Sequence, residues 1–344
     1  MMVMQRIEWI DAAKGIGILL IMLSHCYNFD GLLYFTSGYI PLFFILSGIT
    51  FNPYSSSVSL RKRLKRLLYP NFVYAFIITF LFSIPHLVFN WGWAKFVYGW
   101  ANLLYSRNRL FEGGLYNNIM FEGVFPVITW FLTAMSISYI FLFVYLKQKR
   151  VLLRIAFMVS SIGLLLFLCS YPYLLPWSID TALILWIYIL FGYGLKSVFI
   201  KLKGSLWYGV LTICSLLAYI MLVQFNGELN YSIRNFGIRG FLSIPVSFLI
   251  GILYTWIVSY IAVVLKGTYL FKCLVVAGKL SLMLMCLHLA VYKFFDYFIL
   301  MVGDLNINIY GWVFIKMSFA IIFVLFWKLF VDKYVMKYSI LKWL

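Results

Sequence analysis

The sequence predicts an all-α membrane protein, a polytopic bundle of about ten transmembrane helices. Its residues are 65% hydrophobic and only 11% charged, whereas a soluble globular chain carries about 25% charged residues. Ten apolar runs approach the roughly 20 residues that a helix needs to cross a bilayer. Lysine and arginine are also distributed unequally between alternate connecting segments, as the positive-inside rule requires. We therefore expect a single transmembrane domain over 1–344, with no separate soluble domain.

The apolar runs define the expected spans, in chain order. They are 10–29, 34–52, 69–91, 126–146, 152–170, 178–195, 206–223, 241–265, 273–292 and 309–331. Between the fifth and sixth runs, Pro172 and Pro176 mark a tight turn.

The placement of basic residues predicts the orientation. With the N-terminus inside, 19 of the 28 lysines and arginines lie in inside segments or inner span ends, and six lie outside. We expect cytoplasmic termini. The net charge of +18 is thereby explained by short inside loops, and nucleic acid is not expected as a partner. The longest outside connector, 92–125, is expected to be either an amphipathic or re-entrant lid or an ordinary interfacial connector.

The first span carries three ionisable residues, Asp11, Lys14 and His25, which we call the charged stripe. At about 100° per residue, Lys14 and His25 lie within about 20° of each other, and Asp11 lies about 40° from His25. The rise from Lys14 to His25 is about 16 Å, half of a ~30 Å hydrocarbon core. Because ionisable groups inside a membrane are costly, they usually mark function.

The charged stripe suits a donor with an anionic head and a long thin arm, such as coenzyme A. Lys14 would meet phosphate, and His25, whose ordinary pKa is about 6.5, would act as general base on an acceptor hydroxyl. The alternative is structural: Lys14 extends toward the interface, Asp11 pairs with it, and His25 bonds a neighbouring helix. Ile18 and Met22, between Lys14 and His25 on the same face, are apolar and do not predict an open polar groove.

Further motifs follow along the chain. They are Pro41-Leu42-Phe43-Phe44 running to Ser47-Gly48, Arg63-Leu64-Lys65-Arg66, Trp130-Phe131-Leu132, and Gly278-Lys279-Leu280-Ser281 running to Leu287-His288. Together with the Lys14-x10-His25 spacing, these segments resemble, in order and over most of the chain, the membrane-bound acyltransferase 3 family. The resemblance implies His25 and Asp11 as catalytic residues, an acyl-CoA site that includes Lys14, Arg63 and Arg66, and substrate or structural roles for Ser47, Trp130 and His288.

The resemblance also implies the reaction. An acyl group, acetyl in particular, would pass from cytoplasmic acetyl-CoA to a hydroxyl of an extracytoplasmic or lipid-linked carbohydrate in a bacterial plasma membrane. A partner protein or homo-oligomer could complete such an enzyme. No metal is expected, because the five cysteines form no Cys-x-x-Cys pair. The alternative function is a multi-pass transporter or flippase for a lipid-linked sugar, but the C-terminal half has no second Lys-x10-His pattern of the kind that repeated halves would give.

Overall fold

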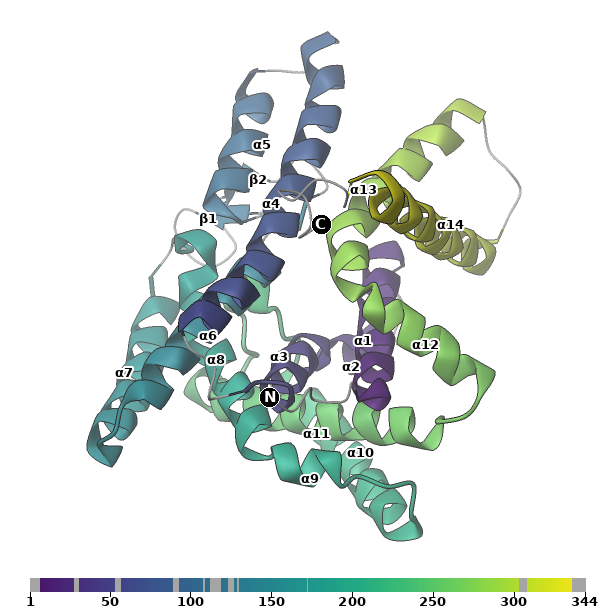
Figure 1. Cartoon of the computed structure of the whole chain (residues 1–344). Coiled ribbons are helices and arrows are strands. Elements are labelled where there is room, and N and C mark those ends of the chain that lie inside the picture. The colour runs from purple at the N-terminus through teal and green to yellow at the C-terminus, as the bar shows by residue number, and fades with distance from the viewer. Residues whose placement is uncertain are drawn as a thin grey trace. The chain divides into compact units, whose positions relative to one another are not determined.

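The computed structural model describes residues 7–27, 31–52, 57–88, 93–107, 109–111, 119–122, 127–128, 130–171, 173–302 and 308–335, which are almost entirely helical (Figure 1). The chain forms two compact units, and each is described by itself. Unit 1 comprises Met1–Phe51, Ile187–Tyr231 and Asn235–Leu282. Unit 2 comprises Asn52–Trp186, Ser232–Arg234 and Met283–Leu344.

Ten helices in the described part of the chain are long and apolar enough to cross a membrane. The predicted fold class, an all-α bundle of about ten transmembrane helices, is thereby confirmed. Several of these helices expose many apolar side chains, and in the helix Val151–Cys169 only Ser161, Leu165 and Leu168 are buried. Such surfaces are stable in lipid rather than in water.

Unit 1 is built on close helix contacts. Its elements are α1 (Glu8–Cys26), α2 (Leu32–Thr36), α3 (Tyr39–Ile49), the end of α8 (Ile179–Gly194), α9 (Lys196–Ile200), α10 (Leu206–Asn226), η3 (Gly240–Leu242), α11 (Ser243–Val264) and α12 (Tyr269–Lys279). The strongest contact joins α1 to α12. A Cβ atom on Gly15 would overlap the carbonyl oxygen of Leu274, and one on Gly278 would overlap that of Asp11. The two backbones therefore touch because both positions are glycine.

Two more glycines join α3 to α8 in the same way. A Cβ atom on Gly48 would overlap the carbonyl oxygen of Ile189, and one on Gly192 would overlap that of Ile45. All of α3 except its first residue is buried, so this helix forms the centre of unit 1.

Unit 2 contains the remaining elements. They are α4 (Ser57–Val88), α5 (Trp93–Tyr105), β1 (Arg109–Phe111), β2 (Ile119–Glu122), α6 (Trp130–Lys147), α7 (Val151–Cys169), η1 (Pro176–Ser178), the start of α8, nearly all of α13 (Ser281–Val302), α14 (Ile309–Phe330) and η4 (Val331–Val335); η2 (Tyr231–Ile233) lies at the boundary. Helix α4 packs against α5 and α6. Figure 1 shows α5 running beside α4.

Two predicted span boundaries are wrong. The third span does not begin at 69, because α4 already begins at Ser57 and includes every basic residue of 61–66. The ninth is not one run over 273–292: α12 ends at Lys279, and α13 begins at Ser281. Apolar composition is continuous across this break, so a search for apolar runs does not detect it.

The connector 92–125 is only partly described. Its first half is α5, whose Trp100 ring lies 5.4 Å from that of Phe76 on α4. Antiparallel β1 and β2 follow, with Arg109 opposite Glu122. Residues 92, 108, 112–118 and 123–125 lie outside the described residues, so the choice between lid and connector stays a prediction.

Candidate functional site

The charged stripe lies on α1 of unit 1. Asp11 is buried, Lys14 is half-buried and His25, in the last turn of α1, is exposed. Asp11 is held where Gly278 of α12 meets its backbone, so the α1–α12 contact fixes this end of the stripe. Exposure of His25 leaves its imidazole accessible to a reactant, as a general base requires.

The stripe is not an open channel wall along its length. Ile18 and Met22, which separate Lys14 from His25, have no exposed surface. A donor arm therefore does not lie directly on this face of α1 in the structure. The side chains of Leu42 and Phe43 of α3 occupy the space beside Gly17, where a Cβ atom would lie. This close packing of α3 on α1 explains part of the burial of Ile18 and Met22.

Ser47 also belongs to unit 1 and is buried in α3. It precedes Gly48, the residue that lets α3 touch α8. The apolar motif that begins at Pro41 therefore has a direct packing role, independent of any role in binding.

Arg63 and Arg66 lie in unit 2, in the basic turns of α4 (residues 61–66). The Nη1 atom of Arg63 donates a hydrogen bond to the Tyr139 hydroxyl of α6 at 2.9 Å, and its guanidinium carbon lies 4.7 Å from that ring's centroid. Arg66 is exposed. The two arginines thus differ: Arg63 joins α4 to α6, whereas Arg66 is the more accessible to an anionic ligand.

Trp130 and His288 lie in unit 2 as well. Trp130 is the buried first residue of α6, and its carbonyl accepts a hydrogen bond from Thr133 at 3.0 Å. His288 has no exposed surface; its Nδ1 lies 2.7 Å from the Leu284 carbonyl oxygen, and its ring lies 5.7 Å from that of Tyr292. Because His288 is buried, it is less accessible to an external substrate than His25.

The search of the sequence missed a buried cluster of charges in unit 2, the arginine–aspartate cluster of Arg107, Asp180 and Arg234. Their exposed fractions are 1%, 0% and 3%. Asp180 accepts a hydrogen bond from Arg107, and its other oxygen lies 3.4 Å from Nε of Arg234. Burial lowers the pKa of Arg107 and of Arg234, and in both cases the charge of Asp180 opposes the shift.

Backbone carbonyls complete the cluster. Arg107 donates to the carbonyls of Leu175 at 3.1 Å and Ser232 at 2.7 Å. Arg234 donates to those of Tyr171 at 2.7 Å and Tyr173 at 3.0 Å, and also to that of Leu168. The cluster therefore ties together three connectors, all of which are predicted to lie outside. The sequence does contain a signal for this cluster. Asp180 lies near the start of an expected span, and Arg107 and Arg234 lie in connectors predicted to be on the same side of the membrane.

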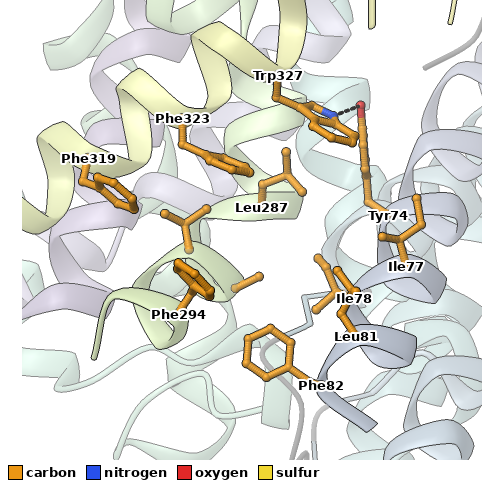
Figure 2. A pocket seen from close by; sticks show the side chains of 12 residues that line it. Tyr74, Ile77, Ile78, Leu81, Phe82, Leu287, Phe294, Phe319, Phe323 and Trp327 are labelled. Carbon is orange, nitrogen blue, oxygen red and sulfur yellow. Dashed lines mark hydrogen bonds between the residues drawn. The ribbon is translucent and has the colours of Figure 1, made fainter. Parts of the chain in front are cut away.

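An apolar cavity of about 400 Å³ lies between α4, α13 and α14 of unit 2 (Figure 2). Its wall includes Leu287, next to His288, and Phe294 and Phe323 face it from two helices. At one end Trp327 donates a hydrogen bond to the Tyr74 hydroxyl at 3.4 Å. The wall has no carboxylate, imidazole or cation. This cavity therefore offers no acid–base group for acyl transfer.

Metal ligands do not gather in the part of the chain that the structure describes: no three histidine, cysteine, aspartate or glutamate residues are placed to hold an ion. The five cysteines are free thiols.

Comparison with known proteins adds one match. A family model described as an acyltransferase domain, that of the acyltransferase 3 family, matches residues 7–329. No curated protein and no solved structure was found to match the chain.

Proposed function

Because the chain belongs to the acyltransferase 3 family, we propose that it transfers an acetyl group from cytoplasmic acetyl-CoA to a hydroxyl of an extracytoplasmic or lipid-linked carbohydrate. Membership of the family makes the chain an integral membrane acyltransferase; the donor, the acceptor and the acetyl group are our proposal. The exposed imidazole of His25 on a membrane-spanning helix is the observation that supports it most directly.

In the proposed reaction, the His25 imidazole acts as general base while the acceptor hydroxyl attacks the thioester of acetyl-CoA. His25 takes the proton of the acceptor hydroxyl as its oxygen attacks the acyl carbonyl. The new carbon–oxygen ester bond forms, the carbon–sulfur bond breaks, and CoA leaves as the thiol after it receives the proton. Asp11 acts through its neighbour Lys14, whose charge it orients toward the donor.

The donor's phosphates need cations at the membrane surface. The resemblance predicts Lys14 of α1 and Arg66 of α4 for this role, each within its own unit. Helix α4 contains no acidic residue, and its N-terminal end adds the positive end of the helix dipole. This arrangement favours an anionic head group over a neutral one.

The test uses purified full-length protein in sealed vesicles of known orientation. Acetyl-CoA labelled in the acetyl group is supplied to the cytoplasmic face, and acceptor saccharides are supplied to the other face. The proposal requires loss of thioester and appearance of label in the saccharide. A transporter would move saccharide without consuming thioester, and that result would refute the proposal. Transfer that occurs only when both substrates are supplied to the cytoplasmic face would contradict the approach of donor and acceptor from opposite faces. It would leave the acyltransferase assignment unchanged.

A further inference from the structure

A groove of about 720 Å³ runs along one side of α4 in unit 2 and, among the described residues, shares only the lining residue Ile77 with the cavity of Figure 2. We call it the α4 groove. Two of its lining residues, Arg61 and Lys65, are basic, and Trp177 of η1 lies toward its other end. The residues between them are apolar or aromatic: Leu64, Leu68, Tyr69, Phe72, Val73, Phe76 and Ile77. The groove thus has one cationic end and a long apolar floor.

The cationic end differs from the donor contacts proposed above. Arg61 and Lys65 are one helical turn apart and share a face of α4, whereas Arg63 points about 200° away from Arg61 and bonds Tyr139. Both Arg61 and Lys65 are exposed. Because α4 has no acid to neutralise them, they present two unopposed positive charges of that helix to whatever occupies the groove.

The length of the groove matches one leaflet. From Arg61 to Phe72 the helix rises about 16 Å, half of a ~30 Å hydrocarbon core. At Phe72 the ring of Trp177 lies 5.5 Å away, and the Trp177 indole is held by a hydrogen bond to the Leu104 carbonyl at 3.0 Å. A lipid acyl chain that starts at the cations therefore reaches Trp177 after about 16 Å.

The apolar floor favours hydrocarbon over the arm of coenzyme A. That arm contains two amides and a hydroxyl, which need hydrogen-bond partners when they leave water. Apart from the two cations, the polar side-chain groups among the described lining residues are the Tyr69 hydroxyl and the Trp177 indole, whose N–H already bonds Leu104. The alkyl chains of a lipid have no polar groups that need hydrogen-bond partners.

We propose that the α4 groove binds an anionic phospholipid. Its phosphate lies between Arg61 and Lys65, and an acyl chain lies along Leu68 and Phe72 up to Trp177. Basic sites beside transmembrane helices are known to select anionic head groups. Under the predicted topology the lipid belongs to the cytoplasmic leaflet.

The experiment titrates delipidated full-length protein in detergent with phosphatidylglycerol that carries bromine on its acyl chains. Bromine quenches the fluorescence of a nearby indole, and the Trp177→Phe variant identifies the part of the signal that belongs to Trp177. We expect saturable quenching by phosphatidylglycerol and weaker quenching by brominated phosphatidylcholine. The double variant Arg61→Gln/Lys65→Gln should bind phosphatidylglycerol about 30-fold more weakly.

The matched control removes the same charge elsewhere. Lys149 and Arg150 are exposed basic residues between α6 and α7, and Lys149→Gln/Arg150→Gln should bind as the unmodified chain does. Equal weakening in both double variants would overturn the proposal in favour of general surface charge. Equal binding of the two lipids would overturn it too. Displacement of the brominated lipid by acetyl-CoA would assign the groove to the donor instead.

Discussion

Arg107 and Asp180 form an ion pair in unit 2 with almost no exposed surface, although 73 positions separate them in the chain. Arg234 approaches the same carboxylate from a third segment. One carboxylate therefore neutralises part of the charge of two buried cations, and its removal leaves both without a negatively charged partner in the cluster.

Asp180→Asn should destabilise the protein strongly. Removing one partner of a buried ion pair lowers the free energy of unfolding by about 3–5 kcal/mol, because the charge of the other partner stays buried. Asp332→Asn is the control: Asp332 pairs with Lys328 at 2.7 Å on the surface of the last turn, where a pair contributes about 0.3–0.5 kcal/mol. Thermal unfolding in detergent measures both, and similar melting temperatures for the two variants would show that the cluster does not stabilise unit 2.

His25→Ala should abolish acyl transfer with little change in stability. A general base contributes about 10²–10⁴-fold, and the His25 side chain is exposed. His288→Ala should instead lower the melting temperature, because it removes a buried side chain that bonds the Leu284 carbonyl. Label transfer and thermal unfolding are measured for each variant. More than about a tenth of the activity in His25→Ala would exclude this residue from the chemistry.

Arg66→Gln should raise the KM for acetyl-CoA by about tenfold with a smaller change for the acceptor, since the lost contact is a charge-assisted bond to phosphate. Lys14→Gln should act in the same direction. Lys149→Gln removes an exposed positive charge from a neighbouring connector and should leave both KM values unchanged. Initial rates at varied concentrations of each substrate make the comparison, and an equal rise for donor and acceptor would argue against a donor contact.

Gly278→Ala should force α1 and α12 apart, because the new methyl group would overlap the Asp11 carbonyl. Overpacking of this kind costs about 1–3 kcal/mol. In α7, Gly163→Ala is the matched control, since its methyl group would meet nothing within 4 Å. We expect a lower melting temperature and lower activity only for Gly278→Ala. A harmless Gly278→Ala would mean that the two helices separate easily.

Sidedness is tested by labelling of single cysteines in intact cells, with Cys214 and Cys273, the exposed native thiols, replaced by serine. Glu228→Cys lies in the connector after α10 and should react with an impermeant reagent from outside. Lys149→Cys should react only after permeabilisation. The reverse pattern would place the termini outside, contrary to the distribution of lysine and arginine.

The sequence was sufficient to predict most of the fold, because each span is a local property of composition and length. The charged stripe follows from the periodicity of a regular helix, and its functional role stays a prediction.

Other features depend on partners that are remote in the chain. The break between Lys279 and Ser281 lies within an apolar run, where hydropathy does not change. The pairing of Arg63 with Tyr139 and the meeting of Arg107 with Asp180 arise only from tertiary packing. The distribution of basic residues along the sequence does not separate an exposed charge from a buried one.

The length of α4 has a consequence for how the protein responds to its bilayer. Its 32 residues extend about 48 Å, well beyond a hydrocarbon core of about 30 Å. The part of α4 that follows the cations, residues 67–88, extends only about 33 Å, and the small hydrophobic mismatch that remains is relieved by tilt or by local deformation of the lipid. The five cations at one end resist being drawn into the core, so they hold that end at the headgroup level. Changes in membrane thickness therefore act mainly on the tilt of α4, and through it on the helices α5 and α6 that pack against it.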